Sequence, residues 1–333
     1  MIKKLISLLI VCLPGVALAA EDITLADPTI FLEDGIYYLY GTSSPDGILV
    51  YTSTDLEYWD GPAGATDGHA LKRGDAWGTK GFWAPQVFKR DGKYFMAYTA
   101  NEQIAIAESD SPLGPFRQET PQHLPASMHQ IDPYVFFDDD GKIYLYHVRL
   151  QDGNRIFVVE LDDDLRTVKE ETAKECISAM PGTWEDTWNA DWTVAEGPTV
   201  VRRDTDGTPL YYLLYSCNDY RNPDYAVGYA TAPTPYGPWQ RYEANPIIST
   251  ANVGCNGPGH GDLFTDKDGN LRYVFHVHHD VRSANPRKTL IAPVYWDAGI
   301  LSVGTGTTAG IHPVTLSAPS APDGWREACP KVP

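Results

Sequence analysis

Residues 131–146 read Ile-Asp-Pro-Tyr-Val-Phe-Phe-Asp-Asp-Asp-Gly-Lys-Ile-Tyr-Leu-Tyr, and this stretch decides the fold. It joins an Asp-Pro step to an apolar run, an Asp-Gly turn and a returning run rich in tyrosine. Glycine supplies the positive φ that a tight turn needs, and aromatic residues suit a half-buried pleated surface. The stretch therefore predicts a β-hairpin.

The same pattern occurs five times along the chain. The copies begin at Asp27, Trp83, Asp132, Glu196 and His260, and successive starts are 56, 49, 64 and 64 residues apart. A second hairpin is predicted after each copy, over residues 48–59, 103–116, 155–169, 225–239 and 289–303. Four strands repeated five times, without helical periodicity between copies, predict an all-β, five-bladed β-propeller. A two-sheet sandwich is the alternative, but a sandwich does not require similar spacings.

The first 19 residues have the pattern of a secretory signal peptide. Lys3 and Lys4 precede an apolar run over residues 5–16, and Ala17-Leu18-Ala19 follows it. The run is too short to span a bilayer as a helix. We therefore expect a soluble product, exported to the periplasm or the extracellular medium. The repeat leaves no room for a linker in residues 20–333. We therefore expect these residues to form a single catalytic domain.

The charge of the mature chain excludes some partners. Without Lys3 and Lys4, 24 basic residues face 44 acidic ones, a formal charge of −20. No basic stripe is present that would neutralise phosphates, so nucleic acid and anionic membranes are not expected as partners. A neutral oligosaccharide or polysaccharide is compatible with this charge. We expect a monomer.

The cysteines and the Asp-Gly turns do not predict a metal site. Four cysteines follow the signal peptide, and their pairing stays open in an exported chain: Cys176, Cys217, Cys255 and Cys329. The Asp-Gly turns fail as calcium loops, because position one of each loop would fall on Phe136, Arg202 or Phe264.

Three histidines near the end of the last copy invite comparison with a metal site. His276 and His278 would share one face of a strand, and His279 follows them. No Asp or Glu stands at a supporting spacing, and histidines in strands usually form hydrogen bonds. A transition metal is therefore not predicted here.

The residues that open the five copies predict an active site. In a propeller the first strand of each blade lines the central axis, so these residues converge. Three of the five are carboxylic acids: Asp27, Asp132 and Glu196. Gathering like charges raises the free energy of ionising them all, which stability alone would not favour. Such clustering is typical of a catalytic centre.

This arrangement resembles glycoside hydrolase family 43, whose five-bladed enzymes remove arabinose or xylose units from plant polysaccharides. The resemblance runs over the mature chain through Ala-Asp-Pro at 26–28, Trp-Ala-Pro at 83–85, Ile-Asp-Pro at 131–133, Glu-Gly-Pro at 196–198 and Gly-His at 259–260. It implies Asp27 as general base, Glu196 as general acid and Asp132 as the residue that tunes and orients the acid. It also implies that Arg287 contacts the sugar and that His260 serves the axis.

The resemblance implies no required cofactor, although His260 would serve the axis through water or a structural calcium ion. Aromatic side chains are expected at the rim of the opening, where they stack on sugars. Trp83 stands at a copy start, and Trp184, Trp188 and Trp192 crowd the segment before Glu196. The connection over residues 218–225 brings Asp219, Tyr220 and Arg221 toward the same mouth.

The sequence therefore predicts an inverting glycosidase. A Trp-rich wall favours release of single sugars from chain ends, with α-L-arabinofuranose first among them. A β-xylosidase, a β-galactofuranosidase and an endo-arabinanase are alternatives on the same scaffold. A propeller that binds carbohydrate without turnover is the alternative from another class, since fold does not fix function. The retaining fructan-cleaving propellers are disfavoured, because their Asn-Asp-Pro-Asn-Gly and Glu-Cys motifs are absent.

Overall fold

The structure is a computed structural model that describes residues 21–205, 207–304 and 310–317. The predicted signal peptide and Cys329 lie outside these residues. No helix in the described ranges is long and apolar enough to cross a membrane.

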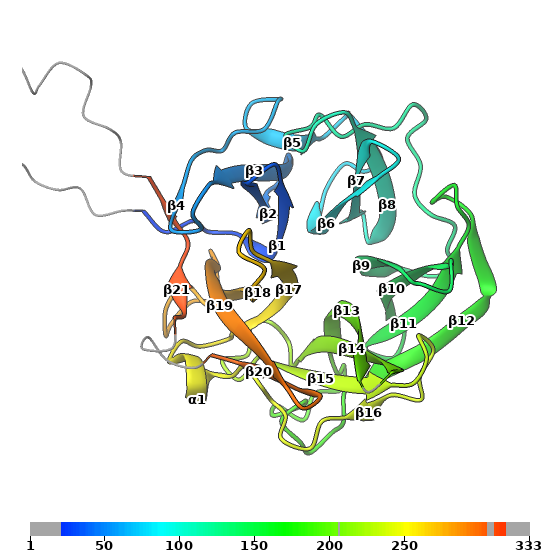
Figure 1. The fold of residues 1–333 in the computed structure, drawn as a ribbon, viewed down its shortest axis with the longest axis vertical. Helices are drawn as coiled ribbons and strands as arrows, with labels where there is room; N and C mark the ends of the chain where they lie inside the picture. The colour runs from blue at the N-terminus through cyan, green and yellow to red at the C-terminus, as the bar shows by residue number, and fades with distance from the viewer. Residues whose placement is uncertain (1–20, 206, 305–309, 318–333) are drawn as a thin grey trace, which may run out of the picture.

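The described strands form six sheets, and five of them are arranged as blades around a central opening, which confirms the predicted propeller (Figure 1). Blade one contains β1 (Ala26–Glu33), β2 (Ile36–Ser44), β3 (Gly47–Ser53) and β5 (His69–Lys72). Blade two contains β6 (Trp83–Arg90), β7 (Lys93–Ala100) and β8 (Gln103–Ser109). Blade three contains β9 (Gln130–Phe137), β10 (Ile143–Leu150), β11 (Asn154–Leu161) and β12 (Val168–Ser178).

Blades four and five complete the ring. Blade four contains β13 (Ala195–Thr205), β14 (Thr208–Cys217), β15 (Ala226–Ala232) and β16 (Gln240–Arg241). Blade five contains β17 (Gly259–Thr265), β18 (Leu271–Val277), β19 (Lys288–Asp297) and β20 (Ile300–Val303), and β21 (His312–Pro313) pairs with β19. The short helix α1 (Thr250–Val253) lies between these two blades. Neighbouring strands within each blade run antiparallel, as the predicted hairpins require.

Three of the predicted second hairpins are wrong in their outer strand. In blade four the outer strand β16 begins at Gln240, just beyond the predicted residues 225–239. In blade one the fourth strand is β5, beyond residues 48–59, because β4 (Tyr58–Trp59) leaves the blade to pair with β22 (Thr315–Leu316). In blade two the segment that follows β8 forms only a single bridge, from Glu108 to Arg117, in place of a strand. The repeat thus predicts the inner three strands of every blade better than the outer edge.

Buried apolar side chains gather between the blades. The described residues form five such clusters, one in each gap between neighbouring blades. Each blade is therefore covered on both faces, which explains why strands such as β10 and β14 are apolar almost throughout. Tyrosines serve well here, because their rings fill the gap while their hydroxyls reach polar atoms, as Tyr146 does to the Pro235 carbonyl.

Every innermost strand contains a bulge at the same place, and this bulge defines the true repeat position. The bulge begins at Asp27, Ala84, Asp132, Gly197 and His260, which all adopt positive φ between 40° and 60°. The copy starts assigned from sequence at Trp83 and Glu196 are therefore one residue too early. The sequence pattern places Glu196 at the same repeat position as Asp27 and Asp132. The structure shows that this placement is wrong, because Glu196 lies one residue before the bulge.

The ends of the described chain close the ring. Strand β22 lies between β4, which it pairs with in parallel, and residues 21–23. The Ile23 amide donates to the Val314 carbonyl at 2.9 Å, and the Leu316 amide donates to the Glu21 carbonyl at 2.8 Å. Val314 is fully buried in the cluster between blades five and one. We call residues 21–23, β4 and β22 the terminal clasp.

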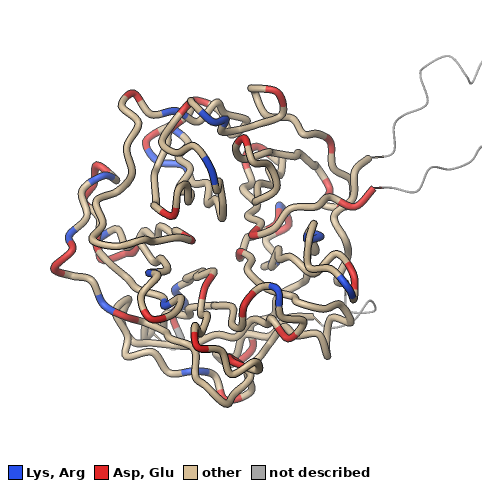
Figure 2. The backbone as a smooth tube through the Cα atoms, turned by 180° about the vertical axis from the view of Figure 1, so that it is seen from behind, with Lys and Arg blue, Asp and Glu red and all other residues tan. Residues whose placement is uncertain are grey.

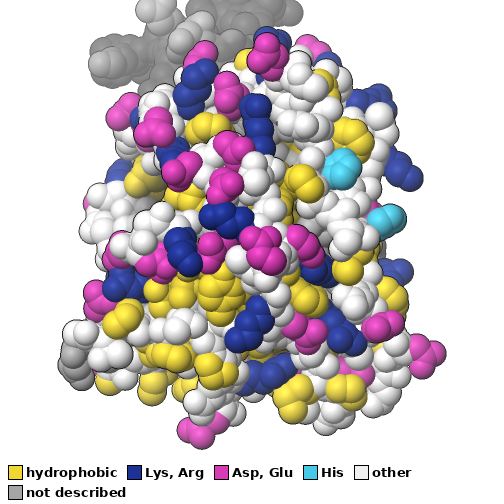
Figure 3. Space-filling view, turned by 90° about the vertical axis from the view of Figure 1, so that its right-hand side faces the viewer, with side chains coloured by type: hydrophobic (Ala, Val, Ile, Leu, Met, Phe, Trp, Pro, Cys, Tyr) yellow, Lys and Arg dark blue, Asp and Glu magenta, His cyan; other side chains and the backbone are white. Residues whose placement is uncertain are grey.

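Charge is distributed unevenly between the axis and the outside. Figure 2 shows acidic residues at the inner ends of blades, around the central opening. The outer wall in Figure 3 carries acidic and basic side chains intermixed. In the part of the chain that the structure describes, Cys176, Cys217 and Cys255 form no disulfide.

Candidate active site

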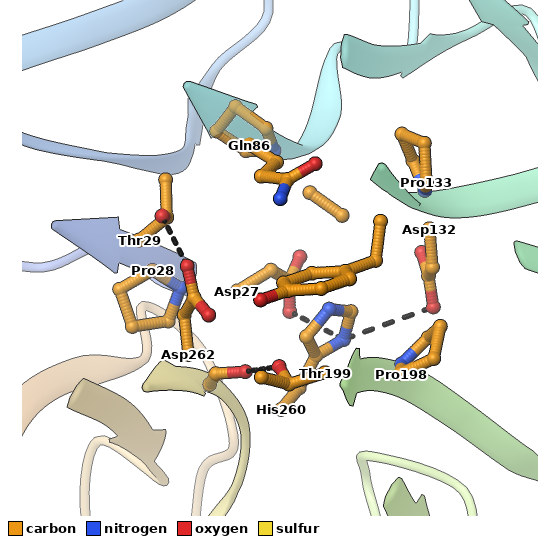
Figure 4. A pocket seen from close by; sticks show the side chains of 14 residues that line it. Asp27, Pro28, Thr29, Gln86, Asp132, Pro133, Pro198, Thr199, His260 and Asp262 are labelled. Atoms are coloured by element: carbon orange, nitrogen blue, oxygen red, sulfur yellow. Dashed lines mark hydrogen bonds and ion pairs between the residues drawn. The ribbon is translucent and has the colours of Figure 1, made fainter. Parts of the chain in front are cut away.

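Three of the predicted residues meet on the propeller axis. Asp27, Asp132 and His260 point toward one another at the inner ends of blades one, three and five (Figure 4). The His260 Nδ1 atom lies 3.4 Å from Asp27 Oδ1 and 3.8 Å from Asp132 Oδ2. Their positive φ aims these side chains into the channel. Such backbone is costly for residues other than glycine and is concentrated at functional sites.

The axial residues are held by the preceding blade through their backbone amides. Four amides donate to a side chain on the second strand of the blade before: Ala84 to Thr42 Oγ1 at 3.0 Å, Asp132 to Thr99 Oγ1 at 2.9 Å, His260 to Ser216 Oγ at 2.8 Å and Asp27 to His276 Nδ1 at 3.1 Å. The corresponding position in blade three is Val148, which has no acceptor. There the Gly197 amide donates to Asp132 Oδ2 instead, at 3.2 Å.

Asp27 is surrounded by groups that favour its ionised form. Its Oδ1 atom accepts a hydrogen bond from Arg287 Nη1 at 2.9 Å, and His276 Nδ1 lies at 3.4 Å. Burial, the largest single effect, would raise the pKa of Asp27. Arg287, His260, His276 and Thr42 together outweigh burial, so the pKa lies below its usual range. The side chain is therefore an ionised carboxylate in a buried site.

Glu196 has the opposite environment. Its Oε1 atom accepts from Tyr225 Oη at 2.8 Å and its Oε2 atom from Asn154 Nδ2 at 2.9 Å, and both donors are neutral. No salt bridge to Glu196 is formed by any residue in the described ranges. Burial and, to a smaller extent, the Asp27 carboxylate raise the pKa of Glu196 to about 7, although the two hydrogen bonds oppose this rise. Glu196 thus carries a proton over part of the neutral range.

Asp132 is coupled to Glu196. Burial raises the pKa of Asp132 well above its usual value, and the Glu196 and Asp27 carboxylates raise it further. The Gly197 amide opposes this by donating to its carboxylate. Two carboxyl groups that interact in this way titrate as a pair, so near neutrality they hold fewer than two negative charges.

These groups open into a pocket of about 420 Å³. The pocket brings together nearly all the site residues expected from sequence: Asp27, Asp132, Glu196, His260, Arg287, Trp83, Asp219, Tyr220 and Arg221. Arg287 lies over the Tyr220 ring, with 4.4 Å between the guanidinium carbon and the ring centroid. Ile131, Asn154, Trp192 and Val194 complete the lining.

The tryptophan segment contributes less than expected. Trp188 is 53% exposed and does not line this pocket. The structure therefore does not place it where it would contact a sugar bound beside the three carboxylic acids. Trp184 packs inward against Tyr215, with ring centroids 5.9 Å apart. Only Trp192, at 49% exposure, reaches the pocket.

The segment is nevertheless firmly attached to blade four. Buried Glu185 accepts from Arg241 through both carboxylate oxygens, at 2.7 and 3.1 Å, and from Tyr215 Oη at 2.7 Å. Asn218 donates to the Trp184 carbonyl at 2.8 Å and accepts from the Thr187 amide at 2.8 Å. These bonds fix the segment that leads to Trp192.

The described residues contain no group of three or more His, Cys, Asp or Glu side chains placed to hold a metal ion. At the axis, His260 is the one imidazole that borders the small cavity of about 20 Å³ beneath the acids, with Asp262 among the other lining residues. Asp262 Oδ1 is buried and has no partner in the described part of the chain. A calcium ion beside His260 would fit only with water as its principal ligand, and it stays a prediction.

Several residues that hold the site were not found from sequence. Asn154, Tyr225 and His276 contact the two principal acids, and Thr42, Thr99 and Ser216 hold axial amides. For His276 the sequence predicts only a strand histidine that forms hydrogen bonds, without a role in the site. The strand register could have identified the residues that hold the axial amides. In each of four blades, the residue of the second strand that pairs with the residue before the bulge carries an acceptor side chain: Thr42, Thr99, Ser216 and His276.

Comparison with known proteins identifies the arrangement. Residues 22–301 match the sequence profile of glycosyl hydrolases family 43. The Xylosidase/arabinosidase 43A of Humicola insolens is 30% identical over 49% of this chain, and the match spans 64% of that relative, slightly under two thirds of its length. The Beta-D-galactofuranosidase xynD of Aspergillus niger is 25% identical over 88% of this chain and 86% of its own. The solved structure of Endo-1,4-beta-xylanase from Bacteroides thetaiotaomicron has 38% identity and a TM-score of 0.79, covering 90% of this chain and 99% of that one.

Proposed function

Because the chain belongs to family 43 of the glycosyl hydrolases, a family of glycosidases, we propose that it releases single terminal pentoses from plant-type polysaccharides with inversion. The sugar we place first is α-L-arabinofuranose. The observation that carries the proposal is one pocket of about 420 Å³ that holds an ionised carboxylate at Asp27 and a proton-bearing carboxyl at Glu196.

The proposed general base is Asp27. Inverting hydrolysis needs a carboxylate that removes a proton from the attacking water while another carboxyl group protonates the leaving oxygen. Arg287 keeps Asp27 ionised at pH values where burial alone would favour the neutral acid. Asp27 is thus suited to accept the proton of water.

The proposed general acid is Glu196. A general acid works best when its pKa is close to the working pH, and burial raises the pKa of Glu196 to about 7. Asp132 is tied to the strand that carries the acid, because the Gly197 amide donates to its carboxylate. We assign Asp132 the orienting and tuning role, since its ionisation is coupled to that of Glu196.

The limited size of the pocket supports attack at chain ends. Trp83 and Trp192 form aromatic walls, and the segment with Tyr220 and Arg221 borders the same opening. An endo-acting enzyme would need an open groove with sugars bound on both sides of Glu196. Digestion of linear and branched arabinan tests this, because early accumulation of oligosaccharides with little monosaccharide would rule out exo action.

A β-xylosidase is the second candidate, because the Humicola relative is named for both sugars and the Bacteroides structure is named a xylanase. A β-galactofuranosidase stays a third, given the Aspergillus relative. Nitrophenyl α-L-arabinofuranoside, β-D-xylopyranoside and β-D-galactofuranoside distinguish them by relative kcat/KM. NMR of the first-formed sugar tests inversion, and a product with the substrate's anomeric configuration would exclude it.

Turnover separates this proposal from a propeller that only binds carbohydrate. Asp27→Ala should lower kcat by several orders of magnitude without changing the fold. Asp34→Asn is the matched control, since Asp34 is exposed at the turn of the same hairpin. Near-normal turnover in Asp27→Ala would refute the base assignment, and a wild-type chain that binds but cleaves no glycoside would refute enzymatic function.

We also propose that the chain acts outside the cytoplasm on neutral polysaccharide. The support is the leader pattern over residues 1–19 and a relative named as an extracellular arabinanase in Bacillus subtilis. N-terminal sequencing of protein recovered from the periplasm and the medium tests export and cleavage near Ala19.

A further inference from the structure

The acid Glu196 is joined to a pocket wall through two hydrogen bonds in series. Trp192 Nε1 donates to Asn154 Oδ1 at 2.9 Å, and Asn154 Nδ2 donates to Glu196 Oε2 at 2.9 Å. Trp192 and Glu196 both line the pocket, and Asn154 lies between them at the start of β11. The indole ring of Trp192, which lines the pocket, is thus connected to the proposed proton donor Glu196 by two hydrogen bonds.

The indole determines which way the Asn154 amide points. An indole nitrogen can only donate a hydrogen bond, so the group facing Trp192 must be the amide oxygen. The amide nitrogen therefore faces Glu196, and this assignment follows from chemistry rather than from the similar shapes of oxygen and nitrogen. With the indole N–H removed, either amide orientation would be available to Glu196.

The backbone brings the two segments together closely enough for this contact. The Asn154 amide donates to the Thr193 carbonyl at 2.9 Å, and Asn154 forms a parallel bridge with Val194. Gly153 precedes it with a φ of 118°, and a Cβ there would lie 2.7 Å from the Thr193 oxygen. Glycine is thus required at 153 for residue 154 to approach the strand that carries the acid.

We propose that Trp192 and Asn154 are positioning residues for Glu196: the indole N–H holds the Asn154 amide with its NH₂ group toward the carboxyl, and a sugar stacked on the same indole is coupled to the proton donor. The inference rests on the proposed function, since it takes Glu196 as the acid. Neither residue needs to touch the reacting atoms.

The held amide changes the balance between the two forms of Glu196. An NH₂ donor stabilises the carboxylate, whereas a rotated amide would offer its oxygen to the carboxylic acid. The other groups that act on Glu196 stay in place when the indole N–H is removed: Tyr225, Asp27, Asp132, Asp219 and Arg221. Loss of the indole N–H should therefore raise the pKa of Glu196.

The test is Trp192→Phe, which keeps an aromatic face and removes the N–H. The pKa of Glu196 is measured by ¹³C NMR of labelled glutamate side chains, with Glu196→Gln to assign the signal. We expect a rise of about half to one pH unit, the equivalent of a hydrogen bond of about 1 kcal/mol. The alkaline limb of kcat/KM, which reports the acid in the free enzyme, should move to higher pH by the same amount.

Trp188→Phe is the matched control, because Trp188 is a similarly exposed tryptophan that does not line the pocket and should leave the Glu196 pKa unchanged. Asn154→Ala is the second variant, and it should shift the pKa in the same direction as Trp192→Phe. An unchanged Glu196 pKa in Trp192→Phe, or in Asn154→Ala should the first variant not fold, overturns the proposal. The NMR titration needs no turnover, so a chain that cleaves no glycoside would refute the proposed function while this measurement still stands.

Discussion

The amide of Gly197 in blade four donates to the Oδ2 atom of Asp132 in blade three across 3.2 Å. At the same position the other blade contacts use a threonine, a serine or a histidine of the second strand, and blade three offers only Val148. In four blade contacts the bulge amide donates to a side chain of the second strand, whereas in the contact between blades three and four it donates to the carboxylate of Asp132. Gly197 itself has a φ of 60°, and a Cβ there would lie 2.8 Å from the His260 ring.

The Thr99 hydroxyl is expected to stabilise the fold, because it accepts a hydrogen bond from the backbone amide of Asp132. Thr99→Val keeps the shape and leaves a buried amide without an acceptor, which costs about 1–3 kcal/mol. Urea unfolding measures the change in the free energy of unfolding. Thr54→Val is the control, because Thr54 is exposed, and it should change the free energy of unfolding by about 0.5 kcal/mol or less. Equal effects for the two variants would contradict the role of Thr99.

Glu196 should be distinguishable as the acid by its dependence on the leaving group. Glu196→Ala removes the proton donor, so natural substrates should lose several orders of magnitude in kcat/KM. Aryl glycosides with strongly acidic leaving groups need little protonation and should lose much less. Steady-state kinetics on a series of aryl glycosides gives the comparison, and equal losses across the series would argue against this assignment.

Arg287 should set the acidic limb of the pH profile. The base works only when ionised, and Arg287 lowers the pKa of Asp27 against the effect of burial. Arg287→Met should therefore raise that pKa by about 1–3 units and move the acidic limb of kcat/KM to higher pH. Arg221→Met is the control, because Arg221 lines the pocket but is paired with Asp219. An acidic limb that stays in place in Arg287→Met would show that another group keeps Asp27 ionised.

The Glu185–Arg241 pair should be worth far more than a surface pair. Glu185 is fully buried, so Arg241→Met would leave an unpaired charge in the protein and destabilise it by about 3–5 kcal/mol. The exposed Arg73–Asp46 pair is the comparison, and Arg73→Met should cost about 0–1 kcal/mol. Denaturant unfolding measures both, and a cost below 1 kcal/mol for Arg241→Met would show that the segment before Trp192 does not depend on this pair.

The inner strands were predictable because the information for them is local. An Asp-Gly turn between apolar runs specifies a hairpin wherever it occurs, and five similar spacings specify the ring. The outer edges were not predictable, because β4 leaves its blade for a partner more than 250 residues away and blade two replaces a strand by one bridge.

The site shows the same division. Asp27 and Asp132 follow from the repeat, since each precedes a proline at an equivalent bulge. Glu196 also follows from its Glu-Gly-Pro motif, but it lies one residue before the repeat position, because in blade four the bulge begins at Gly197. Asn154 and Tyr225 have no motif of their own, and only the folded chain shows that both donate to one carboxyl group.

The terminal clasp has a consequence for how the chain could be rearranged. Residues 21 and 316 are joined by a backbone hydrogen bond of 2.8 Å, so the two ends of the described chain are neighbours. A short linker could fuse them, and new termini could then be opened at an exposed turn such as Asp34-Gly35, as in circular permutation. In such a permutant the terminal clasp would be one continuous segment of the chain. Closing the ring would then no longer depend on the association of two separate chain ends during folding.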